Sequence, residues 1–212
     1  MRIDIYSDTV CPWCFIGKRH LEKALAGSNF GSTDIHWHAF QLNPDLPPEG
    51  RDRREYLDAK FGGPQASAAI HARVSTAGRN AGIDFQFDKI TRSPNTLNSH
   101  RLIRLAEAQR KSQVMVETLF RGYFLEGRDI GDSATLAELA LAAGIVGDMP
   151  VWLAGDGEHA AVLSDLQTGR KLGVSGVPFF IIENRFALSG AQPPEVFMQA
   201  LQAAQQKSRT VN

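Results

Sequence analysis

Cysteine is scarce in this sequence, with only two residues in a chain of 212. A small secreted scaffold held together by disulfides needs several pairs. A chain of this length with 43% hydrophobic residues can build a core without them. The two cysteines, Cys11 and Cys14, lie three positions apart. In a reducing compartment such a pair is more typical of catalysis or metal binding than of a structural disulfide.

An excess of one charge is also missing, because 23 Lys and Arg residues balance 23 Asp and Glu residues. A neutral chain has no bulk electrostatic reason to bind nucleic acid or an anionic membrane. The basic clusters at 51–54 and 101–104 fall in helix-like stretches, and we interpret them as solvated helix faces. We therefore expect no nucleic-acid partner and no membrane partner.

Long hydrophobic runs are absent, and no stretch of about 18 uninterrupted apolar residues predicts a membrane span. The first residues are strand-like, with charges at Arg2 and Asp4, and they lack the apolar segment of a secretory leader. These features favour a cytoplasmic location. A leader removed by processing would leave the same sequence, so that alternative stays open.

The order of patterns predicts an α/β fold with an inserted helical lobe. The start alternates as a strand at 3–6, turns helical from Pro12 to about 26, and alternates again at 35–40. A hairpin at 179–183 and 185–188 and a helix from Pro193 or Pro194 to about 205 close the chain, before a frayed tail at 207–212. Between them we expect helices at 53–61, 64–81, 95–110, 113–125, 133–143 and 159–172. We assign 1–46 and 156–212 to one discontinuous domain and 47–155 to the inserted lobe.

The segment Cys11-Pro12-Trp13-Cys14 stands where a strand gives way to a helix. Cys11 therefore lies among the unpaired N–H groups of a helix N-terminus, which favour a negative charge and hence an attacking thiolate. Pro12 suits the first helical position. Cys14 lies one turn further in, where it is more buried and able to resolve a mixed disulfide.

Two other interpretations of the cysteine pair remain at this point. A zinc site needs two further ligands, and His36 and His38 are the nearest candidates, on the same side of a predicted strand. The second interpretation is a cysteine pair without any function. We expect no metal. A proline that opens a strand, as Pro178 does, is ordinarily preceded by a trans bond.

Several segments together resemble the DsbA-like branch of the thioredoxin superfamily, and within it the FrnE-like cytoplasmic dithiol–disulfide oxidoreductases. They cover almost the whole chain: SDTVCPWCFIG at 7–17, FQLNP at 40–44, Asn95-Thr96 with His100, GVPFF at 176–180 and SGAQ at 189–192. The resemblance implies a thioredoxin-like fold with a helical lid over the site.

The resemblance also implies roles for residues near the thiols. The Val177–Pro178 bond should be cis and lie beside Cys11, and the Val177 backbone should bind an extended substrate. Apart from the resemblance, the position of Pro12 and Trp13 at the helix start predicts that Pro12 and an exposed Trp13 shape the substrate surface. Asp8, three residues before Cys11, and His100, on a predicted lid helix, are candidates for a supporting role around the thiols. A loop residue or cap at Asp8, and a helix histidine with satisfied hydrogen bonds at His100, are the plainer alternatives.

The function we expect is disulfide exchange with Cys11 as nucleophile and Cys14 as resolving thiol. It needs no bound cofactor. The partner would be a disulfide or thiol of a protein, peptide or small molecule, with glutathione among the candidates, and a homodimer is left open.

Two alternatives come from other classes of protein. The chain is similar to glutathione-dependent hydroxychromene carboxylate isomerases and to kappa-class glutathione transferases, which typically have serine in place of Cys11. The other alternative is a non-enzymatic binding module whose helical lid binds apolar segments.

Overall fold

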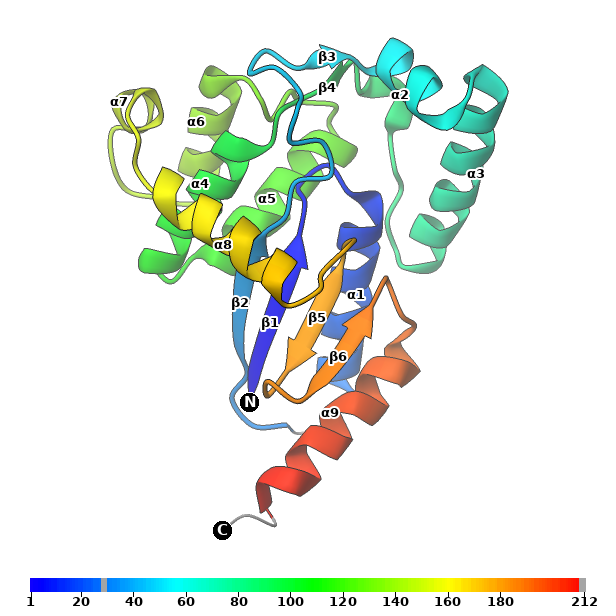
Figure 1. Ribbon diagram of the computed structural model, residues 1–212, viewed down its shortest axis with the longest axis vertical. Helices are drawn as coiled ribbons and strands as arrows, with labels where there is room; N and C mark the ends of the chain where they lie inside the picture. The colour runs from blue at the N-terminus through cyan, green and yellow to red at the C-terminus, as the bar shows by residue number, and fades with distance from the viewer. Residues whose placement is uncertain (28–29, 210–212) are drawn as a thin grey trace.

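A four-stranded sheet forms the centre of the computed structural model, which describes residues 1–27 and 30–209 (Figure 1). The strands are β1 (Arg2–Ser7), β2 (Asp34–Ala39), β5 (Phe179–Ile182) and β6 (Phe186–Ser189), in the spatial order β2-β1-β5-β6. β1 pairs parallel with β2 and antiparallel with β5, and β5 pairs antiparallel with β6. The central strand β1 is buried from its second residue onward.

Helices cover both faces of this sheet. α1 (Pro12–Ala26) and α9 (Pro194–Arg209) pack against each other, with α9 also against β5 and β6, while α8 (His159–Lys171) crosses β2 on the opposite face (Figure 1). The hairpin between β5 and β6 turns at Glu183 and Asn184, whose φ angles are 53° and 52°, and the Arg185 N–H closes the turn on the Ile182 carbonyl at 3.0 Å. The α/β class and the expected hairpin are confirmed.

The segment between β2 and α8 is mainly helical and gathers at the end of the sheet where α1 begins (Figure 1). Its elements are β3 (Arg51–Asp52), α2 (Arg53–Phe61), α3 (Pro64–Asn80), the 3₁₀ turn η1 (Phe87–Lys89), β4 (Arg92–Ser93), α4 (Leu97–Ala108), α5 (Ser112–Phe124), α6 (Ser133–Ala142) and α7 (Met149–Ala154). Asp132 caps α6 by accepting a hydrogen bond from the Thr135 N–H. A helical insertion in a thioredoxin-like fold is therefore confirmed. Its boundaries at 46/47 and 155/156 remain a prediction.

Aromatic packing joins the helical insertion to the sheet domain. The fully buried Phe15 of α1 stacks on Phe120 of α5, with ring centroids 5.0 Å apart. Phe85 and Phe124 extend the cluster through edge-to-face contacts. Burial of such large rings is a dominant stabilising contribution in a core. The start of α1, with both cysteines, is thereby held between the sheet and the insertion.

The sequence patterns did not reveal four short elements, β3, η1, β4 and α7, and they ended the last helix too early. α7 has six residues between Asp148 and Gly155, too few for a helical period to be visible. The β3–β4 ladder has two residues on each side and joins segments 40 residues apart, so no local pattern marks it. α9 continues to Arg209, so the expected frayed tail was wrong for 207–209; residues 210–212 lie outside the described part.

The interpretation of Arg101 as part of a solvated face was wrong. Its side chain is buried and donates hydrogen bonds to the carbonyl oxygens of Gly157 at 2.7 Å, Leu153 at 3.2 Å and Trp152 at 3.4 Å, and also to that of Gly155. Trp152 and Leu153 lie in the last turn of α7, and Gly155 and Gly157 follow it, so the guanidinium binds both the end of the helix and the loop after it. Among the described residues no helix is long and apolar enough to cross a membrane.

Candidate functional site

Cys11 occupies the N-cap of α1, immediately after the loop that follows β1. Its backbone is extended, with φ −93° and ψ 109°, and Pro12 takes the first helical position. The Cys11 N–H donates to the Asp8 carbonyl at 3.0 Å, and the Cys14 N–H donates to the Cys11 carbonyl at 3.0 Å. The sulfur of Cys11 thus stands at the positive end of a 15-residue helix, as the sequence predicted.

The loop before β5 lies directly beside Cys11. The Val177–Pro178 peptide bond is cis, as the family resemblance implied. The Cys11 thiol donates to the Val177 carbonyl oxygen at a sulfur–oxygen distance of 3.6 Å. Gly17 makes this approach feasible, because a Cβ there would lie 3.1 Å from both Pro178 Cγ and Phe180 Cζ.

Cys14 is the more enclosed of the two free thiols, with 1% of its surface exposed against 3% for Cys11. Burial raises the pKa of the Cys14 thiol well above its usual value, and its hydrogen bond with Cys11 raises it further. A hydrogen bond with the Ser7 hydroxyl opposes this shift in part. The raised pKa therefore favours the protonated thiol at Cys14. Ser7 was missed at the sequence level, since its side chain meets Cys14 only through the turn between β1 and α1.

Asp8 and His100 form a buried pair behind the turn that carries Cys11. Asp8 is fully buried, and its Oδ2 accepts a hydrogen bond from the Leu42 N–H at 2.7 Å. Its Oδ1 lies 3.4 Å from Nε2 of His100, beyond good hydrogen-bond geometry, and has no other partner in the described part. The His100 ring is 3.1 Å from the Phe40 carbonyl oxygen. The pair connects the cysteine turn to the loop after β2, and no hydrogen bond joins either side chain to a thiol in the described part.

A cavity of about 340 Å³ opens beside Cys11, between the start of α1 and the helices α2 and α3. We call it the thiol cavity. Cys11 and Trp13 line it from α1, Leu57 from α2 and Ile70 from α3. Two helices of the insertion therefore cover Cys11, as the family resemblance implied. The Trp13 side chain is half-buried and lies under the Arg73 guanidinium, 5.8 Å from the ring centroid, so the expectation of an exposed rim residue was wrong.

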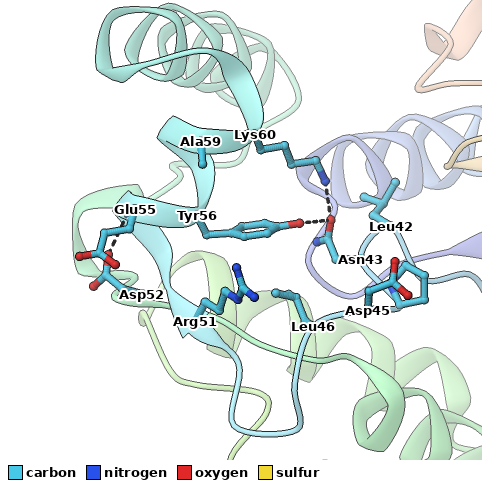
Figure 2. A pocket seen from close by; sticks show the side chains of 11 residues that line it. Leu42, Asn43, Asp45, Leu46, Arg51, Asp52, Glu55, Tyr56, Ala59 and Lys60 are labelled. Atoms are coloured by element: carbon cyan, nitrogen blue, oxygen red, sulfur yellow. Dashed lines mark hydrogen bonds between the residues drawn. The ribbon is translucent and has the colours of Figure 1, made fainter.

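A second, more open cavity of about 840 Å³ adjoins the thiol cavity on the far side of Tyr56. Figure 2 shows the Tyr56 ring reaching across it to the Asn43 side chain, where the hydroxyl donates to Oδ1 at 2.6 Å. The Lys60 ammonium donates to the same oxygen. No cysteine is among the described residues that line this larger cavity.

The thiol cavity also has basic lining that sequence reasoning missed. Arg53 was assigned to a solvated face, but it is half-buried, donates to the Tyr123 hydroxyl at 2.9 Å and lies over the Phe87 ring. Arg73 and Lys60 line the same cavity. Helical periodicity could place these residues on α2 and α3, but the packing of those helices over Cys11 has no local signal.

The histidines considered as zinc ligands are engaged elsewhere. His36 contacts Glu107 and Asp34, and His38 contacts Asp4 and Asp165, at nitrogen–oxygen distances of 2.8–3.1 Å. Within residues 1–27 and 30–209, no group of three or more His, Cys, Asp or Glu side chains is placed to hold a metal ion.

A Cys-X-X-Cys pair at the first helix of a β-α-β unit, facing a cis-proline loop, defines a dithiol protein of thioredoxin fold. The chain belongs to the family of DSBA-like thioredoxin domains, whose model matches residues 2–202. It is 31% identical to a probable DsbA oxidoreductase from Streptomyces coelicolor, with a TM-score of 0.89 over 96% of this chain and 89% of that chain.

Two further solved structures share the fold. One is the cytosolic disulfide reductase DsbM from Pseudomonas aeruginosa with GSH, at 20% identity and a TM-score of 0.67 over 96% of this chain and 98% of that chain. The other is a 2-hydroxychromene-2-carboxylate isomerase, at 14% identity and a TM-score of 0.73 over the full length of both chains. The architecture therefore serves both disulfide chemistry and isomerisation.

Proposed function

We propose that this protein is a dithiol–disulfide oxidoreductase in which Cys11 attacks the substrate disulfide and Cys14 resolves the product. The observation that carries the proposal is the asymmetry of the two thiols. Cys11 caps the N-terminus of α1 and lines the thiol cavity, whereas Cys14 is buried behind it with a raised pKa. A thiolate is stabilised at a helix N-terminus, and thiolate is the attacking species in disulfide exchange.

The reaction takes two exchange steps. The Cys11 thiolate attacks one sulfur of the substrate disulfide, forms a mixed disulfide and releases the other half as a thiolate. Cys14 then loses its proton and attacks the Cys11 sulfur, which releases the second half as a thiol and leaves a Cys11–Cys14 disulfide. Two electrons pass from the protein to the substrate. The reverse sequence oxidises a dithiol substrate.

Substrate binding is proposed for the surface around Cys11. The Val177 carbonyl accepts the Cys11 thiol hydrogen in the reduced protein. Once Cys11 is bonded to substrate, that carbonyl becomes free to accept a backbone N–H from an extended segment. Pro12 and Trp13 line the cavity next to it, and Pro178 fixes the course of the loop. Asp8 and His100 are proposed to support the cysteine turn.

We further propose a FrnE-like protein that works in the cytoplasm without a bound cofactor, on the disulfide of a protein, peptide or small molecule. A cytosolic disulfide reductase among the fold neighbours supports the compartment. We also propose that the protein can form a homodimer. The proposed domain boundaries are a discontinuous thioredoxin-like domain at 1–46 and 156–212 and an inserted helical domain at 47–155.

A glutathione-dependent isomerase or transferase is the second candidate. It is supported by the GSH in the DsbM structure and by the isomerase of the same fold. In that case Cys11 would lie near the tripeptide sulfur. Turnover of an aromatic electrophile that depends on glutathione and survives Cys14→Ser would favour it over dithiol exchange.

Trapping with cysteine variants tests the proposed function. Cys11→Ser should abolish reduction of insulin with dithiothreitol as reductant, and Cys14→Ser should accumulate a mixed disulfide at Cys11, seen by mass spectrometry. Full activity in Cys11→Ser would refute the nucleophile assignment. A protein that acts only as a binding module would keep its function in the double variant.

A further inference from the structure

The charged side chains that line the thiol cavity are all positive. Arg53, Lys60 and Arg73 line it, and none of its described lining residues is Asp or Glu. Disulfide exchange itself does not need this basic lining, because the nucleophile and the resolving thiol supply the chemistry. A pocket lined by one sign of charge concentrates ligands of the opposite sign.

None of these basic side chains is neutralised by a carboxylate. Arg53 donates to the Tyr123 hydroxyl, Lys60 donates to the Asn43 amide oxygen, and Arg73 lies over the Trp13 ring. Within the described residues no ion pair with Asp or Glu involves any of the three.

The carboxylates around the thiol cavity line neighbouring cavities and not the thiol cavity itself. Asp45, Asp52 and Glu55 line the larger cavity beyond Tyr56. Asp58 and Asp88 line a separate cavity beyond His71 and Phe87. Burial lowers the pKa of His71, and the nearby Arg53 lowers it further, which keeps that ring neutral near pH 7. The positive field in the thiol cavity therefore comes from the three permanent cations and the N-terminus of α1.

The rest of the cavity wall is apolar. Trp13 contributes an aromatic surface from α1, Leu57 from α2 and Val74 from α3 contribute aliphatic surface, and Phe87 closes one side. A volume of about 340 Å³ is near the lower end of the range of about 300–1,000 Å³ for small-molecule sites. It suits a compact organic group better than a folded polypeptide chain.

We infer that the preferred substrate is a small disulfide whose halves combine an apolar body with a carboxylate. This inference rests on the proposed dithiol chemistry and names its substrate class. The apolar body would lie against Trp13 and Phe87, with its sulfur at Cys11 and its carboxylate toward Arg73 and Lys60. One molecule of reduced protein and one of disulfide give the Cys11–Cys14 disulfide and two small thiols.

A charge-matched pair of aromatic disulfides tests the inference. Reduced protein is mixed in a single turnover with dithiobis(nitrobenzoate), which is anionic, or with dithiodipyridine, which is neutral. Each rate is divided by the rate of the same disulfide with a free monothiol, which removes intrinsic reactivity. The normalised ratio of anionic to neutral substrate should exceed one, and it should fall as salt is raised from about 0.02 M to about 0.5 M.

Arg73→Gln is the main variant, because this side chain is exposed and lies over the Trp13 ring. The anionic-to-neutral ratio should fall about fivefold, as expected for losing one charge near the surface. Arg73→Gln with Lys60→Gln should lower it further. Arg79→Gln, an exposed arginine on the same helix and outside the cavity lining, is the matched control and should keep the wild-type ratio.

The inference would be overturned if the normalised ratio of anionic to neutral substrate were near one and changed neither with salt nor in Arg73→Gln. The proposed function would still stand if both disulfides reacted through Cys11. If neither disulfide oxidised the Cys11–Cys14 pair, the proposed function itself would fail. The two failures are therefore distinguishable in one experiment.

Discussion

The Cys11 sulfur lies 3.6 Å from the carbonyl oxygen of Val177, although the two residues are 166 positions apart in the chain. The thiol donates its hydrogen to this oxygen, so the oxygen is occupied while Cys11 is a thiol. Ionisation of Cys11 or formation of a mixed disulfide removes that donor. A covalent bond at Cys11 therefore leaves the Val177 carbonyl free for the backbone hydrogen bond that the proposed function assigns to it.

Gly17→Val tests the packing that brings this loop to Cys11. A Cβ at position 17 would come within 3.1 Å of Pro178 and Phe180, and Phe180 is itself fixed edge-to-face against Phe197 with centroids 4.7 Å apart. Overpacking of this kind costs about 1–3 kcal/mol, which exceeds the gain of less than about 1 kcal/mol from replacing a helical glycine.

Urea unfolding should show this loss of stability, and reduction of peptide disulfides should fall more than alkylation of Cys11 by a small reagent. Gly176→Ala is the control, because a Cβ there meets nothing within 4 Å. Equal stability of Gly17→Val and wild type would contradict the close approach.

Asp8→Ala should destabilise the turn that carries Cys11. The substitution leaves the Leu42 N–H without its acceptor and removes the carboxylate that faces His100. A buried polar group left unpaired costs about 1–3 kcal/mol. Asp8→Asn keeps an acceptor oxygen for Leu42 and should lose less.

Chemical denaturation measures the stability of both Asp8 variants, and the rate at which Cys14 resolves a mixed disulfide measures the effect on the site. If Asp8→Ala and Asp8→Asn were both as stable as wild type, Asp8 would have no supporting role.

Arg101→Ala should be strongly destabilising, since the buried guanidinium satisfies carbonyl oxygens at the end of α7 and beyond it. We expect a loss of at least about 3 kcal/mol, because several buried acceptors lose their donor together. Arg101→Lys should recover only part of it, because an ammonium cannot reproduce the planar fork.

Arg104→Ala is the matched control for this prediction. Arg104 lies three residues further along α4, is partly exposed and pairs with Glu107. Surface pairs of this kind contribute about 0–1 kcal/mol. Thermal unfolding of the three variants should therefore separate Arg101 from Arg104, and similar losses at both positions would contradict the buried role.

Local patterns accounted for most helices and strands and for the position of the cysteine pair. Alternation marked β1 and β2, and the proline after Cys11 marked the start of α1. The position of Val177 and Pro178 beside the thiols came from family resemblance, because spacing alone says nothing about two segments so far apart in the chain.

Contacts that depend on tertiary packing escaped prediction. Arg53 and Arg101 read as charges on solvated helices, since periodicity assigns a face to a residue but not the neighbour that covers it. The hydroxyl of Ser7 near Cys14 and the cations over Cys11 arise in the same way, when separate elements pack around one turn. Of these features, only the cations over Cys11 enter the substrate proposal.

A network of His38, Asp4 and Asp165 joins α8 to the sheet and makes the stability of the fold sensitive to pH. The His38 ring lies 3.1 Å from Oδ1 of Asp165 on α8 and 2.8 Å from Oδ1 of Asp4 on β1. Burial by itself would lower the pKa of His38, but the hydrogen bonds to Asp165 and Asp4 outweigh it and raise the pKa above 6.5. For Asp4, burial is outweighed by hydrogen bonds from Arg2 and His38, which lower its pKa below 3.8.

The two shifts act on stability at opposite ends of the pH range. Because folding raises the pKa of His38, its contribution is fully present below about 6.5 and is lost as pH rises through the folded value. Because folding lowers the pKa of Asp4, its contribution is present above about 3.8 and is lost as pH falls through the folded value. The network should therefore stabilise most between about pH 4 and 6.5.

Thermal unfolding between about pH 6 and 8 should reveal the His38 contribution as a falling midpoint temperature. His38→Gln and Asp165→Asn should both flatten that fall, since each removes one side of the hydrogen bond that raises the pKa. Asp34→Asn, which removes an exposed carboxylate from the same strand, is the control and should keep the wild-type slope. An unchanged slope in His38→Gln would mean that another group carries the pH dependence and that the link between α8 and the sheet does not rely on a protonated histidine.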